Sequence, residues 1–124
     1  MFQRILTLWD GSDVSERALS AALDLASKYD AEVVATSVVA PGEPTPLESL
    51  FAERHGSHGG VALSHEVIEG RNPSEDLLAY AHEHAFDLLV VGHHHHPKPG
   101  VLVLHGVTEH VISDADLPVL VVGG

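Results

Sequence analysis

Residues 33–39 read Val-Val-Ala-Thr-Ser-Val-Val, and this stretch decides the fold class. Apolar and β-branched residues follow one another there with little alternation, which is typical of a parallel strand covered by helices on both faces. Further apolar runs lie at 2–8, 87–91 and 118–122. Residues 61–68 instead alternate between apolar and polar side chains, which is typical of an edge strand. The sequence therefore predicts five strands.

Helix signals separate these strands. Ser12 and Asp13 precede an amphipathic stretch, so a helix is predicted to begin there. Asn72 and Pro73 combine an N-cap with a first-turn proline, which predicts a helix to about residue 84. Shorter helices are predicted at 47–54 and 107–113. Alternating strands and helices predict a single doubly wound α/β domain over residues 1–124, with a five-stranded parallel sheet and helices on both faces.

Composition excludes several classes of function. Six basic and eighteen acidic residues give a net charge of −12, which disfavours binding to nucleic acids and to anionic membranes. The chain has no cysteine, so disulfides, thiolate metal sites and cysteine nucleophiles are excluded. No stretch resembles a signal peptide or a membrane span. We therefore expect a cytoplasmic protein.

The last predicted strand lacks the charges that usually protect a free sheet edge. Residues 118–122 read Pro-Val-Leu-Val-Val. An uncovered apolar edge invites pairing with another chain. We therefore expect a homodimer formed through Val119–Val122.

Three groups of residues resemble the universal stress protein family. They are Ile5–Ser12 with Ser15–Leu19, Asp87–Gly92, and Thr108–Ile112 with Pro118–Val122. The resemblance covers essentially the whole chain and is poor only at 41–60, which is shorter than the usual second-helix region of that family. It implies a five-stranded parallel sheet, a homodimer joined partly through the last strands and, in many members, a bound ATP or AMP.

The resemblance also implies a site, but one that is altered here. Nucleotide-binding members carry G-x2-G-x9-G-[ST] after the fourth strand, where glycines let the backbone approach the phosphates. In this frame Gly92 keeps the first position, whereas His95 and His105 replace the two other glycines and Gly106 replaces the hydroxyl residue. Asp10 and Val38 match family positions near the adenine and ribose. The resemblance thus implies a degenerate nucleotide site at Asp10, Val38, Gly92, His95, His105 and Gly106.

Two of these features have competing interpretations. Asp10 is equally suited to ordering the turn at residues 10–12 without a ligand. His93–His96, with His105 and Lys98, would form a cationic patch near pH 6 that binds phosphate. Alternatively, His93 and His95 would bind zinc, nickel or copper together with His105 or His110. A polar loop without a ligand is the third interpretation.

The sequence gives little support for catalysis. It contains no G-x-S-x-G elbow and no P-loop lysine motif, although slow ATP hydrolysis occurs in some members of the family that it resembles. We do not expect an enzyme. The preferred hypothesis is a dimeric stress-response module that acts by binding a protein partner. An adenine-nucleotide sensor that uses His95 and His105, and metal binding by the His93–His96 loop, are the alternatives.

Overall fold

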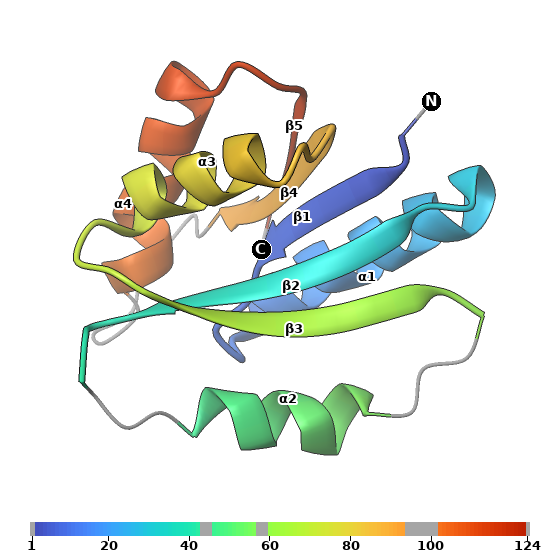
Figure 1. Cartoon of the computed structure of the whole chain (residues 1–124), viewed down its shortest axis with the longest axis horizontal. Coiled ribbons are helices and arrows are strands. Elements are labelled where there is room, and N and C mark those ends of the chain that lie inside the picture. Colours follow the sequence, from blue (N-terminus) through green and yellow to red (C-terminus); the bar gives the residue numbers. More distant parts are fainter. Residues whose placement is uncertain (1, 43–45, 57–59, 94–101, 124) are drawn as a thin grey trace.

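The computed structural model describes residues 2–42, 46–56, 60–93 and 102–123, and for residues 102–107 it describes the backbone alone. Strands and helices alternate in the predicted order (Figure 1). The strands are β1 (Arg4–Leu8), β2 (Glu32–Val39), β3 (Ala62–Glu69), β4 (Leu88–His93) and β5 (Val119–Gly123). The helices are α1 (Asp13–Tyr29), α2 (Leu47–His55), α3 (Pro73–Glu83) and α4 (Leu102–Asp114).

The five strands form one parallel sheet in the order β3-β2-β1-β4-β5. β1 lies at the centre, and β3 and β5 lie at the two edges. The edge position predicted for residues 61–68 is therefore confirmed. Because β2 and β4 lie on opposite sides of β1, the chain reverses its direction of winding at β1, as in doubly wound folds.

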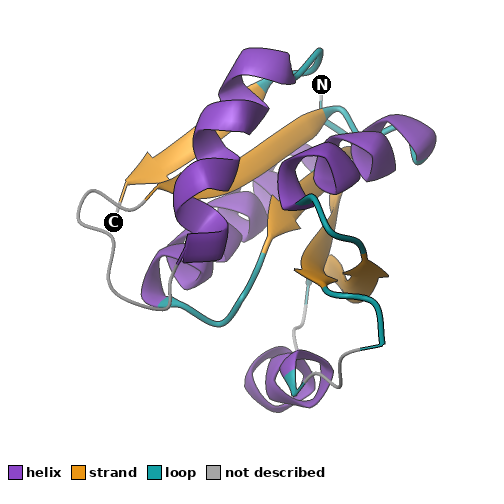
Figure 2. Ribbon diagram, turned by 90° about the vertical axis from the view of Figure 1, so that its left-hand side faces the viewer, coloured by secondary structure: helices purple, strands orange, loops and turns teal. Residues whose placement is uncertain are grey.

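Helices cover both faces of the sheet, as predicted (Figure 2). On one face, Ile5, Val33 and Val90 of the sheet pack in a cluster with Leu19 of α1 and Phe51 of α2. On the other face, strand residues pack with α3 and α4; this second cluster includes Leu6, Val34, Leu89, Leu77 and Val111. Alternate residues of each strand thus serve opposite cores. In the described part of the chain, no helix is both long and apolar enough to cross a membrane.

The helix starts follow from local capping. The Ser12 side chain accepts a hydrogen bond from the Ser15 backbone N–H at 3.3 Å, which satisfies a free donor in the first turn of α1. Asn72 caps α3 in the same way, and Pro73 is the first residue of that helix. Both starts agree with the sequence prediction.

The region after β4 differs from the prediction. β4 extends to His93, so Gly92 lies in the strand rather than at the start of a loop. α4 begins at Leu102, five residues before the predicted Val107, and the backbone of His105 and Gly106 is therefore helical. A glycine inside a helix costs only about 1 kcal/mol relative to alanine, so Gly106 does not set a boundary. The predicted loop placement of His105 and Gly106 was wrong.

β5 leaves an apolar edge open. It pairs with β4 on one side, and no other described strand pairs with it. Leu120 and Val121 remain 37% and 39% exposed, and Ile112 on α4 is 56% exposed. The edge has the character predicted from the sequence, whereas the dimer expected to cover it remains a prediction.

Candidate functional site

The candidate site lies where the carboxyl ends of β1 and β4 meet. Ligands of open parallel sheets bind at this point, because the connections on either side leave in opposite directions. Asp10 follows β1, and continuing the register of β1 on β2 beyond its last pair, Leu8 with Thr36, brings Val38 to the same end of the sheet. Continuing the register of β1 on β4 brings Gly92 and His93 to the same end of the sheet. Asp10, Val38 and Gly92 thus lie at the same end of the sheet, whereas a nucleotide site formed by them remains a prediction.

Asp10 orders the turn between β1 and α1. Its carboxylate Oδ1 accepts a hydrogen bond from the Ser12 backbone N–H at 2.9 Å. Gly11 between them has φ +85°, a left-handed conformation that favours glycine. The turn role predicted for Asp10 is therefore observed, and contact with a ligand remains a prediction.

Gly92 is required by packing, independently of any ligand. A Cβ built on it would lie 2.8 Å from Cγ2 of Val14 and 3.0 Å from the Val14 carbonyl oxygen. Real Cβ atoms do not approach other atoms so closely, so only glycine lets the end of β4 pass the first turn of α1. The first glycine of the phosphate motif thus has a structural reason to be there.

Two side chains of α4 are joined to the end of β4. The buried Thr108 hydroxyl donates a hydrogen bond to the Gly92 carbonyl oxygen at 2.7 Å. His93 Nε2 lies 3.0 Å from Oε1 of Glu109. This acidic partner brings negative charge close to any phosphate that His93 would bind.

The other histidines of the predicted site are not placed. His95 lies outside the described residues, and for His105 and Gly106 only the helical backbone is described. Among the described residues, no group of three or more histidine and acidic side chains is arranged to hold a metal ion. Metal binding through His93, His95 and His105 therefore remains a prediction.

Beside this site lies a cluster that the sequence did not reveal, which we call the α2 anchor: Trp9, Glu16, Phe51, His55 and His65. The Glu16 carboxylate accepts a hydrogen bond from the Trp9 indole N–H, and its Oε1 lies 3.0 Å from His55 Nε2. The His65 ring stacks on Phe51 with centroids 4.4 Å apart. Both histidines are half-buried, and their neighbours come from distant parts of the chain, so the sequence alone does not indicate these contacts.

Burial favours the neutral form of His65 by lowering its pKa. The Ser37 hydroxyl donates to the Trp9 carbonyl oxygen at 2.6 Å, so the 2.9 Å contact between Ser37 and His65 requires Nε2–H of His65 as the donor. Nδ1 of His65 is buried and has no partner among the described residues. Burial lowers the pKa of His65, against the opposing effect of the Glu48 and Glu66 carboxylates.

The helix α2 itself also contacts the candidate site. Arg54 of α2 donates a hydrogen bond to the Gly11 carbonyl oxygen at 3.0 Å, directly beside Asp10. The same guanidinium lies 4.0 Å from Glu16. α2 therefore stabilises the turn that follows β1.

Comparison with solved structures shows what this arrangement is similar to. A crystal structure of a universal stress protein in complex with cAMP superposes with a TM-score of 0.77 at 26% identity, covering 98% of this chain and 96% of that chain. The universal stress protein UspA from Lactobacillus plantarum superposes with a TM-score of 0.79 at 22% identity, covering 98% and 97% of the two chains. The second likeness supports the fold alone.

Sequence comparisons agree. A relative from Methanocaldococcus jannaschii, universal stress protein MJ0531, is 32% identical, covering 98% of this chain and 82% of its own length. A universal stress protein of Thermus aquaticus is 29% identical, covering 98% and 99% of the two chains. The model of the universal stress protein family matches residues 1–123. The chain therefore belongs to the universal stress protein family.

Proposed function

We propose that this universal stress protein is a cytoplasmic homodimer that acts by binding a protein partner rather than by catalysis. The observation that carries the proposal is the open edge of β5, where Leu120 and Val121 are 37% and 39% exposed. A strand edge with unpaired backbone groups and apolar side chains readily pairs with another chain. Ile112 on α4 is a further exposed apolar side chain, at 56%.

The candidate site supports a function that does not depend on bound triphosphate. Asp10 is engaged in its turn, and Gly92 is explained by its packing on Val14. Histidines replace glycine at the two remaining glycine positions, which removes the freedom of the backbone to approach phosphates. A protein of this fold that acts by binding a partner does not require the nucleotide that many family members bind.

The first experiment measures the oligomeric state by size-exclusion chromatography with light scattering. We expect the wild-type chain to be a dimer, and Leu120→Lys and Val121→Lys to be monomers, because an unpaired ammonium would be buried at the edge. Ser20→Lys, on an exposed position of α1, is the matched control and should stay dimeric. A monomeric wild type, or dimeric lysine variants, would count against the proposal.

The second candidate function is binding of an adenine nucleotide. It is favoured by the position of Asp10 and Val38 at the same end of the sheet and by the structural relative solved with cAMP, a ligand with a single phosphate. In this case His95 and His105 would replace the backbone donors at the phosphate.

Calorimetric titration with ATP, AMP and cAMP separates the two candidates. Micromolar binding that is lost in His95→Ala or His105→Ala would establish the nucleotide function. Absence of binding by all three nucleotides supports the protein-partner function. A parallel titration with zinc tests the metal hypothesis, which requires His93, His95 and His105 to act together.

A further inference from the structure

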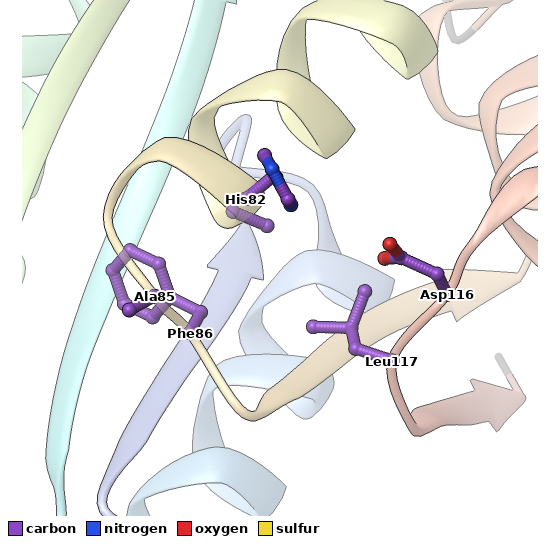
Figure 3. A pocket seen from close by; sticks show the side chains of 6 residues that line it. His82, Ala85, Phe86, Asp116 and Leu117 are labelled. Atoms are coloured by element: carbon purple, nitrogen blue, oxygen red, sulfur yellow. The ribbon is translucent and has the colours of Figure 1, made fainter.

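A cavity of about 170 Å³ lies at the end of the sheet opposite the candidate site (Figure 3). It is bounded by the carboxyl end of α3 and by the turn between α4 and β5. Its apolar surface comes from Ala81, Ala85, Phe86 and Leu117, and its polar surface comes from His82 and Asp116. The cavity opens beside the strands where β4 and β5 begin, away from Asp10 and Gly92.

The two ionisable side chains of this cavity are not used by the fold. His82 and Asp116 are both exposed, and neither side chain forms a hydrogen bond or ion pair with the described part of the chain. Their neighbours behave differently, since Asp87 accepts the backbone N–H groups of Gln3 and Arg4 at 2.8 and 3.1 Å. Figure 3 shows the Leu117 side chain beside Asp116, with His82 of α3 on the other side of the cavity, so polar and apolar groups share its lining.

Size and charge define the ligand that such a cavity would take. Cavities of about 150 Å³ hold a benzene-sized molecule, so this one accommodates a single ring with a short substituent. A carboxylate only accepts hydrogen bonds and attracts positive charge. The net charge of −12 favours cations and disfavours anions over the whole molecule.

We propose that this cavity binds a small organic cation, an amine with an apolar body about the size of an aromatic ring. Asp116 binds the ammonium group, and Leu117 with Ala81 contacts the apolar body. This site goes beyond the proposed function, because it involves neither the edge of β5 nor the candidate site at Asp10.

The test is a titration of the full chain with benzylamine near neutral pH, where the amine is protonated, monitored by NMR chemical shifts. We expect saturable binding with a Kd of about 1 mM, a value typical of a ligand this small. Asp116→Asn keeps the shape of the side chain and should weaken binding by about tenfold. Asp114→Asn, two residues earlier and outside the cavity, is the matched control and should bind as the wild type does.

Benzyl alcohol tests the charge of the ligand, because it keeps the ring and lacks the ammonium group. It should bind about tenfold more weakly than benzylamine. The proposal is overturned if Asp116→Asn binds benzylamine as the wild type does, if both ligands bind equally, or if the wild type shows no saturation up to about 10 mM. Circular dichroism of each variant establishes that the fold is retained.

Discussion

Gly92 illustrates how a single residue can belong to a motif and to the core at once. Its Cα faces Val14, and a methyl group there would approach Cγ2 of Val14 to 2.8 Å. We expect Gly92→Ala to lower the free energy of unfolding by about 1–3 kcal/mol, which is typical of overpacking. Thermal and urea denaturation of the variant measure this loss.

A double-mutant cycle tests the cause of that loss. Val14→Ala removes the methyl group that Gly92→Ala would strike, so the double variant should lose less stability than the sum of the single variants. Additive losses would mean that the clash with the Val14 side chain is not responsible, which leaves the contact with the Val14 carbonyl oxygen.

His65 makes stability depend on pH. Because burial lowers its pKa in the folded chain below the ordinary 6.5, the unfolded chain binds more protons near that pH. The contribution of His65 to stability is therefore complete above pH 6.5 and is lost as the pH falls through the lowered pKa. Urea midpoints should decrease with acidification across this range.

His65→Gln isolates this effect, because glutamine retains a donor for Ser37 but does not titrate. The part of the pH dependence due to His65 should disappear in this variant. His82→Gln, at an exposed position of α3, should keep the wild-type dependence. An unchanged profile in His65→Gln would assign the pH dependence to other groups.

Residue by residue, the sequence is most informative where the signal is local. The capping role of Ser12 and the turn at Asp10 involve neighbours within five positions, so both were predictable. The partner of His65 is Phe51 on another element, and that of Gly92 is Val14, seventy-eight positions earlier in the chain. Such contacts depend on how the elements pack, which a single sequence does not contain.

Among the elements, α2 depends most on its anchor. It has nine residues, and its N-cap makes no side-chain hydrogen bond. Isolated helices this short are marginal in water, so packing must supply their stability. Glu16 is central to that packing, since it contacts Trp9, His55 and Arg54.

We expect Glu16→Ala to lower the free energy of unfolding by about 1–3 kcal/mol, because the buried Trp9 indole N–H loses its partner. Trp9 is the only tryptophan of the chain, so its emission should shift to the red as α2 loosens. Asp24→Ala, which lies on α1 like Glu16, removes an exposed ion pair with Lys28. It should lower the free energy of unfolding by about 0.5 kcal/mol or less, without a change in the emission spectrum. An emission spectrum unchanged in Glu16→Ala would show that α2 is held by its apolar contacts.

Element types were predictable, whereas one boundary was not. The apolar strands and the capped starts of α1 and α3 have strong periodic or local signals. The start of α4 at Leu102 has no such signal. Residues 101–104 are apolar without a helical period, and Gly106 is a residue that usually disfavours a helix. Apolar runs of this length fit a strand, a buried helix or a loop equally well.

At the scale of the whole molecule, net charge acts on the proposed dimer. Each protomer carries −12, so two protomers repel one another at long range. At 0.1 M ionic strength, salt largely screens the repulsion between exposed charges that lie more than about 10 Å apart. Sedimentation at about 50 and about 500 mM salt should show tighter dimers at the higher concentration. Weaker dimers at high salt would instead indicate an interface held by ion pairs.

β4 lies between the candidate site and the open edge. Its end pairs Gly92 with Val122 and His93 with Gly123, while its other side faces β1. A substitution in this strand therefore affects two properties at once, namely the shape of the candidate site and the support of β5. At Gly92 the two effects coincide, because this residue packs on Val14 of α1 and pairs with Val122 of β5.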